Sequence, residues 1–330
     1  YEIYRCDWSS DVCFSDLIRY KPKLTLGLLP SCRPDPSRQK KPGVMKTQPP
    51  PAIVLPKLPP IQREFVFTDD DFDRIRRFIH QRAGIALNPS KKDMVYGRLV
   101  RRIRALQLPS FTAYLERLFS ERGGEELEHF VNALTTNLTY FFREEHHFPI
   151  LAEHLRTLSG EVNIWCCAAS TGEEPYSLAM TALETASSGA RLNVNIVATD
   201  LDTNVLRVGA EGIYGAEAIN KLPAGMANRY FDRVDDQRWR AKPALRQMIR
   251  FQQLNLVDTQ WSVRGPFDAI FCRNVMIYFD RDTQLAVLRR FAPLLKPDGL
   301  LFVGHSENFY HATDLFRLRG KTVYERVSKA

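Results

Sequence analysis

The feature that most constrains the fold is an alternation of short apolar strands and helical segments that begins after residue 155. The segments that we predict as strands are Val162–Ala168, Val194–Thr199, Phe267–Cys272 and Leu300–Val303. Helical spacing separates them at about Pro175–Thr185, Asn204–Val208 and Thr283–Leu295. Strands that alternate with helices form βαβ units, and such units form a mostly parallel, doubly wound sheet. We therefore predict an α/β domain over residues 156–330.

Two parts of this domain depart from the alternation. Residues from about 213 to 253 contain short charged segments that we predict as a small antiparallel β-subdomain, namely Tyr230–Val234, Arg238–Ala241 and Met248–Phe251. The final Phe316–Val327 reads as a hairpin at an antiparallel edge of the main sheet.

Residues 61–135 have a helical pattern instead. Thr68 can cap a first helix whose opening turn is acidic, and Gly84 can end that helix. Three more short helices are predicted at about Lys91–Leu106, Phe111–Ser120 and Glu125–Leu134. We expect an N-terminal helical domain here, joined to the α/β domain by a linker, residues 136–155, that contributes to the active site.

The second of these helices is strongly basic on one side. Between Lys91 and Arg104 it carries six basic residues and one acidic residue, and the arginines that lie away from or beside its apolar stripe are Arg98, Arg101, Arg102 and Arg104. A solvated helix face and a docking surface for an acidic partner both explain this pattern. Aromatic residues for stacking on bases are missing from it, which argues against single-stranded nucleic acid.

Most of the net charge of +8 lies outside the predicted domains. Residues 1–60 hold ten Lys and Arg against five Asp and Glu, together with many prolines, and we expect them to be a disordered tail. The opening stretch YEIYRCDWSSDVCFSDL resembles translated sequencing-adaptor sequence, so Met45 is a candidate natural start. Overall charge therefore gives no reason to expect a nucleic-acid partner.

The cysteines and the apolar runs suggest a reduced, aqueous compartment. Cys166, Cys167 and Cys272 lie in apolar runs and are expected to be buried thiols, and Cys6 and Cys13 lack the spacing of a zinc site. No apolar run approaches the roughly 20 residues of a membrane-spanning helix. We expect a cytoplasmic protein that neither inserts into membranes nor binds a metal.

In an open α/β sheet, ligands bind where the parallel strands end. The segment Ala168–Pro175 follows the first strand, lacks the glycine pattern of dinucleotide sites, and carries Glu173 and Glu174, which would repel a pyrophosphate and suit a cationic ligand. Asp200 ends the second strand, where a carboxylate can accept hydrogen bonds from ribose hydroxyls. Together these residues favour an adenosine ligand without phosphates, although an acid after a strand can also be a simple helix cap.

Two further segments should meet at the same edge. Phe267–Phe279 delivers Arg273, Asn274 and Tyr278 to the end of its strand, where they are either functional or buried structural residues. Thr135–Arg143 is rich in hydroxyls and aromatic rings and ends in an arginine.

Five segments together resemble the CheR family of chemotaxis-receptor methyltransferases, in order and over about residues 65–327: TTNLTYFFRE–HHFP, AASTGEEPYS, ATDLD, FDAIFCRNVMIYFD and LLKPDGLLFVGHSE. The resemblance implies a helical N-terminal domain and a Rossmann-like catalytic domain. It also implies S-adenosylmethionine as methyl donor, S-adenosylhomocysteine as product, and glutamates on the cytoplasmic helices of a chemoreceptor as acceptors. A monomer is expected.

The resemblance also implies roles for residues at matching positions. The residues that would line the cofactor site are Asn137, Thr139, Arg143, Glu174, Asp200, Asn255, Leu256, Arg273 and Asn274. Arg143 and Tyr278 would lie nearest the transferred methyl group. The basic helix would face the acidic receptor helices.

One departure from the family pattern is informative. Members that bind a receptor's C-terminal pentapeptide carry a glycine-bearing loop insertion in the β-subdomain, whereas Tyr230–Trp239 is short and has no glycine. We therefore expect an enzyme that does not depend on the pentapeptide. Three alternatives stay open: a nucleotide-dependent oxidoreductase, a non-catalytic module that senses S-adenosylmethionine, and a methyltransferase for nucleic acids or small molecules.

Overall fold

The first helix shows how local sequence sets the boundaries of an element. The hydroxyl of Thr68 accepts a hydrogen bond from the Asp71 amide, and the Asp71 side chain accepts one from the Thr68 amide, which forms a reciprocal cap. At the other end Gly84 adopts φ 69°, a left-handed conformation that glycine takes without strain. The predicted start and end of this helix are confirmed.

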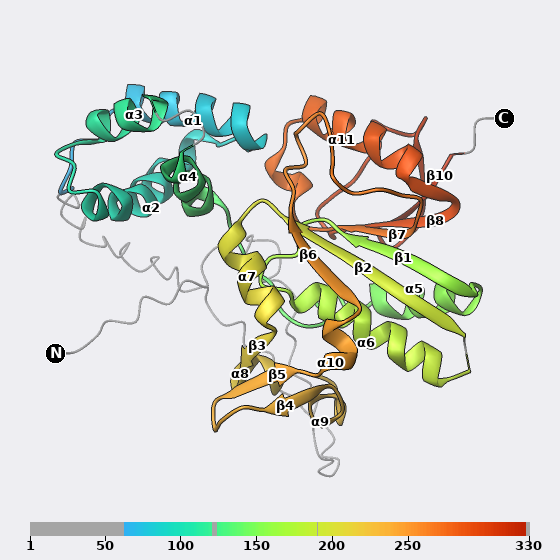
Figure 1. Ribbon diagram of the computed structural model, residues 1–330. Helices are drawn as coiled ribbons and strands as arrows, with labels where there is room; N and C mark the ends of the chain where they lie inside the picture. The colour runs from blue at the N-terminus through green and yellow to red at the C-terminus, as the bar shows by residue number, and fades with distance from the viewer. Residues whose placement is uncertain (1–62, 121–123, 190, 328–330) are drawn as a thin grey trace, which may run out of the picture. The chain divides into compact units, whose positions relative to one another are not determined.

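A computed structural model describes residues 63–120, 124–189 and 191–327 (Figure 1). The predictions for residues 1–60 therefore lie outside the described residues. The helices are α1 (Asp69–Ala83), η1 (Pro89–Lys91), α2 (Lys92–Ala105), α3 (Phe111–Ser120), α4 (Glu125–Leu134), α5 (His147–Arg156), α6 (Glu173–Ser187), α7 (Thr203–Glu211), α8 (Ala216–Ile219), α9 (Met226–Tyr230), α10 (Pro243–Arg246), η2 (Met276–Tyr278) and α11 (Arg281–Leu294). The strands are β1 (Gly160–Cys166), β2 (Leu192–Asp200), β3 (Ile213–Gly215), β4 (Phe231–Arg233), β5 (Arg238–Ala241), β6 (Ile249–Gln253), β7 (Phe267–Cys272), β8 (Leu295–Val303), β9 (Phe316–Gly320) and β10 (Val323–Arg326).

The main sheet has the order β6-β2-β1-β7-β8-β10-β9. The first five of these strands are parallel to their neighbours, and β10 pairs antiparallel with both β8 and β9. The mostly parallel, Rossmann-like sheet and its antiparallel edge hairpin are thus confirmed. The chain order reverses on either side of β1, so the carboxyl ends of β1, β2 and β7 form the edge where a ligand is expected.

Successive residues of β1 face the two sides of this sheet. Ile164 and Cys166 join the core that contains α5 and α6, whereas Trp165 and the next residue after the strand, Cys167, join the core that contains α11. Figure 1 shows α5 and α6 on one face of the sheet and α11 on the other. This alternation is the two-residue period of a strand that is covered on both faces. The three predicted buried cysteines, Cys166, Cys167 and Cys272, are free and buried.

The antiparallel insert is confirmed, but its composition differs from the prediction. Strands β3, β5 and β4 form the small sheet, with β5 in the middle. The prediction that placed Met248–Phe251 in this insert is wrong, because β6 pairs in parallel with β2, from Ile196 opposite Ile249 to Asp200 opposite Gln253. An edge strand with charged residues resembles an exposed antiparallel strand in sequence, and only the pairing distinguishes them.

Two further features of the described chain bear on the site. Helices α1 to α4 share their own apolar core, which includes Ile75, Leu99 and Phe130. Part of the segment expected as a linker is α5, whose first residue, His147, is fully buried.

No helix among the described residues has the length and apolar character that crossing a bilayer requires.

Candidate active site

The loop after β1 brings the start of α6 to the edge of the sheet. Gly172 caps α6 at φ 98°, and a Cβ atom there would lie 2.7 Å from the Tyr214 hydroxyl and 2.9 Å from the Cα of Gly209. Only glycine therefore fits this turn. The helix begins at Glu173, two residues before the predicted start at Pro175.

Asp200 at the end of β2 is held by the backbone. Its two carboxylate oxygens accept hydrogen bonds from the amides of Ser170 (2.8 Å) and Asp202 (3.0 Å). Burial raises the pKa of Asp200 although these amides oppose the shift. Each oxygen keeps a lone pair, so the half-buried carboxylate can still accept bonds from a pair of ligand hydroxyls.

Asn137 connects the segment before α5 to this end of the sheet. Its Nδ2 donates to Asp202 Oδ2 at 2.9 Å, and its carbonyl oxygen accepts a hydrogen bond from the Ser170 hydroxyl at 3.0 Å. The same Asp202 caps α7 by accepting from the Asn204 amide. Asn137 and Asp200 are therefore joined through Ser170 and Asp202.

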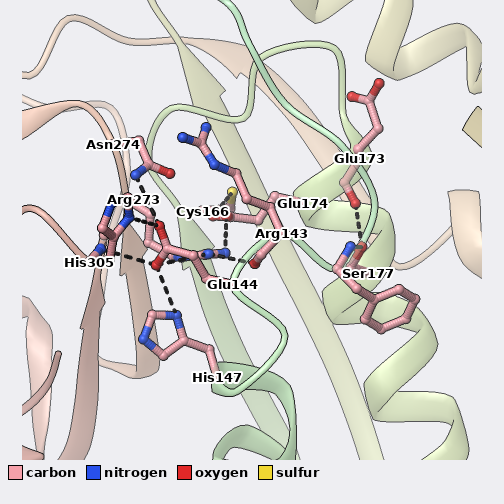
Figure 2. Close-up of polar contacts among 12 residues, drawn as sticks. Arg143, Glu144, His147, Cys166, Glu173, Glu174, Ser177, Arg273, Asn274 and His305 are labelled. Carbon is pink, nitrogen blue, oxygen red and sulfur yellow. Dashed lines mark hydrogen bonds and ion pairs between the residues drawn. The ribbon is translucent and has the colours of Figure 1, made fainter. Parts of the chain in front are cut away.

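A second polar network surrounds Arg273 at the end of β7 (Figure 2). Its guanidinium donates to Glu174 Oε2 and to the carbonyl oxygen of Arg143, both at 2.5 Å, and lies 3.3 Å from Glu144 Oε2. Burial lowers the pKa of Arg273, but the charges of Glu174 and Glu144 outweigh it and raise the pKa. The guanidinium Nε is buried and has no hydrogen-bond partner among the described residues.

Glu144 is the hub of this network, a role that was not predicted from the sequence. It accepts hydrogen bonds from the amide and Nδ1 of His305 and from Nδ2 of Asn274. Burial raises the pKa of Glu144, but the His305 bond, the Arg273 charge and the Asn274 bond lower it to about 2. The ionised Glu144 thus holds Arg273 and Asn274 in place.

Glu307 holds the turn that follows β7, and it too was missed from the sequence. Its carboxylate accepts hydrogen bonds from four backbone amides, those of Asn274, Val275, Met276 and Gly304. Burial raises the pKa of Glu307, and the four amides oppose that shift. Nothing in its sequence position announces this role, because the four donors come from the ends of two different strands.

The side chain of Arg143 points away from the Arg273 network (Figure 2). Its Nη1 donates to the carbonyl oxygen of Leu138 at 2.7 Å, and its guanidinium lies 6.0 Å from the centre of the Tyr140 ring. Arg143 is half-buried. The guanidinium therefore keeps free donors for an anionic group at the edge of the sheet.

Glu173 and Glu174 have different environments. Glu174 faces Arg273 and accepts from Cys166 Sγ at 3.4 Å, whereas Figure 2 shows the Glu173 side chain pointing the other way. Thr171 donates to Glu173 at 2.6 Å, and burial raises the pKa of Glu173. Glu174 is thus the carboxylate placed for a cationic group near Arg143.

Three predicted site residues make no contact with these networks. Thr139 forms no hydrogen bond with the described residues. Asn255 donates to the Arg82 carbonyl oxygen and lines a cavity of about 370 Å³. Leu201, which follows Asp200 in the chain, and Gln253, which lies opposite Asp200 in the paired strand, line the same cavity. Leu256 follows Asn255 in the chain, and its side chain is buried.

Tyr278 lies between two apolar cores. Its side chain packs partly buried against the core of α11 and against that of α1 to α4, and its carbonyl oxygen accepts from the Ala86 amide at 2.7 Å. No hydrogen bond of its hydroxyl group is present among the described residues.

The arginines of the basic helix α2 are mostly engaged within the protein. Arg98 donates to the carbonyl oxygens of Leu134 and Thr135 at the end of α4. Arg102 pairs with the buried Glu126 at 2.6 Å, and Arg104 pairs with Glu64. Arg101 alone of the four is exposed without an ion pair to the described residues.

Among the described residues, Glu144, His146 and His147 could each offer a metal-ligand atom, all within 4.8 Å of one another. The Glu144 carboxylate is already occupied by His305, Asn274 and Arg273, which would compete with a cation. The expectation that the protein has no metal stays a prediction.

Comparison with known proteins bears on both parts of the chain. Residues 137–325 match the family model described as CheR methyltransferase, SAM binding domain, and residues 70–135 match that of the CheR methyltransferase, all-alpha domain. The chemotaxis protein methyltransferase of Escherichia coli (strain K12) is 53% identical over 260 residues, which cover 78% of this chain and 91% of that protein. Chemotaxis protein methyltransferase 2 of Pseudomonas aeruginosa is 48% identical over 268 residues, 79% of this chain and 95% of that protein.

Proposed function

The chain belongs to the CheR methyltransferase family, and we propose that it transfers the methyl group of S-adenosylmethionine to glutamate side chains on the cytoplasmic helices of a chemoreceptor. The protein is an S-adenosylmethionine-dependent methyltransferase of chemotaxis. The observation that best supports the acceptor class is Arg143. Its guanidinium extends away from the buried network at the catalytic edge and offers a planar pair of donors that suits a carboxylate.

The residues at the edge of the sheet fit S-adenosylmethionine at each of its parts. Asp200 suits the ribose hydroxyls, and Glu174 suits the α-ammonium group. The positive charge of Arg273 at the end of β7 suits the α-carboxylate. The cavity that Leu201 and Asn255 line lies next to Asp200 and would take the adenine. Leu256 follows Asn255 in the chain, and Asn137, Thr139 and Asn274 are further cofactor residues that the family resemblance implies.

The chemistry needs little from the protein beyond placement. When bound, S-adenosylmethionine supplies a methyl group on a positively charged sulfur, which a carboxylate can attack in line. A glutamate has a pKa of about 4.3, so the acceptor is ionised at neutral pH and needs no general base. Holding the two reactants in line can contribute roughly 7–11 kcal/mol.

Arg143 and the Arg273 network divide this work. Arg143 would orient the acceptor carboxylate through one face of its guanidinium, and Tyr278 would line the path of the methyl group. Arg273, held by Glu144 and Glu174, would keep the backbone carbonyl of Arg143 in place. We place the enzyme in the cytoplasm as a monomer that binds no nucleic acid.

The proposal is tested with tritiated-methyl S-adenosylmethionine, the purified protein and membranes that carry chemoreceptors. We expect base-labile methanol to be released from the receptor band, as a methyl ester requires. Cofactor binding in a calorimeter without any ester on the receptors would leave the fold intact and remove the substrate assignment.

We further propose that the enzyme works without a receptor's C-terminal pentapeptide. The connection from β4 to β5 is a short turn in which Val234 and Arg238 pair through the backbone and Asp235 accepts from the Gln237 and Arg238 amides. No glycine-bearing insertion is present there to receive a peptide.

The matching experiment presents an immobilised pentapeptide from a receptor C-terminus to the purified protein. We expect no binding by surface plasmon resonance, and equal methylation of a receptor with and without the pentapeptide. Binding at micromolar concentration would contradict this proposal and leave the methyltransferase assignment unaffected.

A further inference from the structure

An open hollow of about 460 Å³ adjoins the candidate active site on the side of β8. It lies between η2, the first turns of α11 and the loop that follows β8. Its lining includes Met276, Ile277, Arg281, Phe309, Tyr310 and His311. We refer to it as the 276–311 hollow.

The 276–311 hollow and the active site share their framework. Ile277 directly precedes Tyr278, and the Glu307 carboxylate accepts from the Asn274 amide on the active-site side and from the Met276 amide on the hollow side. Gln284 of α11 donates to the carbonyl oxygens of Met276 and Phe279, which fixes η2 against α11. A partner bound in the hollow is thus bound at a fixed position relative to Arg143.

The hollow is cationic. Arg281 is exposed, and no carboxylate of the described residues forms an ion pair with it. The one acidic residue in the lining, Glu307, is 4% exposed, and its carboxylate accepts hydrogen bonds from four backbone amides. Arg281 also occupies the first position of α11, where the helix dipole disfavours a cation. An arginine at this position therefore does not stabilise the helix.

The same hollow exposes apolar surface. Ile277 is 48% exposed and Tyr310 is 75% exposed, which is unusual for such large side chains, and Met276 and Phe309 are buried beneath them. The Nε2 atom of His311 is buried without a hydrogen-bond partner among the described residues. Exposed apolar groups beside an unpaired cation fit an amphipathic, acidic partner.

We propose that the 276–311 hollow binds the acceptor helix itself, on the far side of the methylated glutamate from α2. Arg281 pairs with a second acidic residue of that helix, and an apolar side chain one turn away packs on Ile277 and Tyr310. Residues three, four or seven positions apart lie on the same face of a helix, so a helix with one glutamate at the active site presents further side chains of that face to the adjoining hollow. This inference rests on the proposed function.

Most of the arginines of α2 that were expected to dock the receptor are engaged within the protein. Three of the four arginines expected to dock the receptor already bind groups within the protein, namely Arg98, Arg102 and Arg104. Arg101 and Arg281 are cations that remain for acidic groups on the acceptor helix.

The test uses charge reversal at two positions of the same helix, in the full chain. Arg281→Glu changes the hollow, and Arg289→Glu is the matched control, because Arg289 is also exposed on α11 but does not line the hollow. Tyr310→Ala removes apolar surface without changing charge. Binding of S-adenosylhomocysteine by calorimetry and far-ultraviolet circular dichroism establish that each variant is folded.

The readouts are the initial rate of ester formation against receptor concentration and direct binding of a soluble receptor cytoplasmic fragment by fluorescence anisotropy. We expect Arg281→Glu and Tyr310→Ala to raise KM and Kd for the receptor by about five- to tenfold with kcat nearly unchanged, in line with losing a single contact of a protein interface. Arg289→Glu should change neither.

Equal effects of Arg281→Glu and Arg289→Glu, or no effect of either, would overturn the proposal. Measurements on the wild-type protein distinguish a failure of the proposed function from a failure of the role of the hollow. If it forms no ester on the receptor, the proposed function fails. If it does form the ester and Arg281→Glu behaves like the control, only the role of the hollow fails.

Discussion

At the scale of single residues, Arg143 is positioned by its backbone. Its neighbours Phe142 and Glu144 adopt φ values of 55° and 54°, in the left-handed region that side chains other than glycine seldom occupy. Each such residue costs about 1–3 kcal/mol and persists because surrounding contacts hold it. Here the contacts are the Arg273 bond to the Arg143 carbonyl and the bonds to the Glu144 carboxylate. The side chain of Arg143 takes no part in these contacts, and only its Nη1 is engaged, by the Leu138 carbonyl oxygen.

Arg143→Ala should therefore reduce turnover far more than cofactor affinity. We expect kcat to fall by about 100-fold or more, as for removal of a transition-state donor, and the Kd for S-adenosylhomocysteine to change by less than about fivefold. Rates from the tritium assay and Kd from calorimetry measure the two effects. Arg143→Lys is the control that keeps the charge without the planar fork. Equal losses in rate and affinity would make Arg143 a cofactor ligand instead.

At the scale of elements, α2 holds the helical part of the protein together. Arg102 reaches Glu126 on α4, which is 4% exposed and also accepts from the Tyr114 hydroxyl of α3. One arginine thus joins three helices through a buried carboxylate. The same helix binds the end of α4 through Arg98, directly before the segment that leads to Arg143.

Arg102→Ala should lower the free energy of unfolding by about 3–5 kcal/mol, because it leaves the buried Glu126 charge without a partner. Arg101→Ala, one position away on an exposed face, should change it by less than about 0.5 kcal/mol. Urea unfolding monitored by circular dichroism measures both. Similar values for the two variants would contradict the role of Arg102 as the partner of the buried Glu126.

At the scale of the whole molecule, His147 connects distant parts of the chain. Its Nε2 lies 3.0 Å from both the Lys321 carbonyl oxygen and the Thr322 hydroxyl, in the turn between β9 and β10. Burial, followed by the charge of Arg273, lowers the pKa of His147 to about 4. Between pH 6.5 and 4, the folded protein therefore keeps His147 neutral, whereas the unfolded chain, with a histidine pKa near 6.5, binds a proton there.

The sign of the pH dependence follows from that difference. The contribution of His147 to stability is present above pH 6.5 and is lost as the pH falls toward 4, by up to about 3 kcal/mol. Glu144, with a pKa of about 2, adds a second loss between about pH 4.5 and 2. His147→Gln should remove the part of the loss between pH 6.5 and 4 that comes from His147, and the neighbouring His146→Gln should leave it. Burial also lowers the pKa of His154 and of His311, so both variants keep the contribution of those two residues. Urea midpoints measured across this pH range decide between them, and identical profiles for both variants would contradict the role of His147.

The sequence alone determined much of this protein, because local patterns carry the signal. The caps at Thr68 and Gly84, the four helices and the strand periodicity predicted the elements, and the strand ends marked Asp200 and Arg273 as site candidates. The resemblance to a family on five segments supplied the cofactor and the acceptor class.

Only the tertiary structure decided which residues face one another. β6 could be recognised as part of the main sheet only from its pairing with β2, and Arg102 as a buried partner only from Glu126. The donors to Glu144, and three of the four donors to Glu307, lie more than 30 residues away in sequence, and neither carboxylate has a local pattern that marks it. Local periodicity reports which side of an element is apolar, whereas hydrogen-bond partners depend on how the strands and helices come together in space.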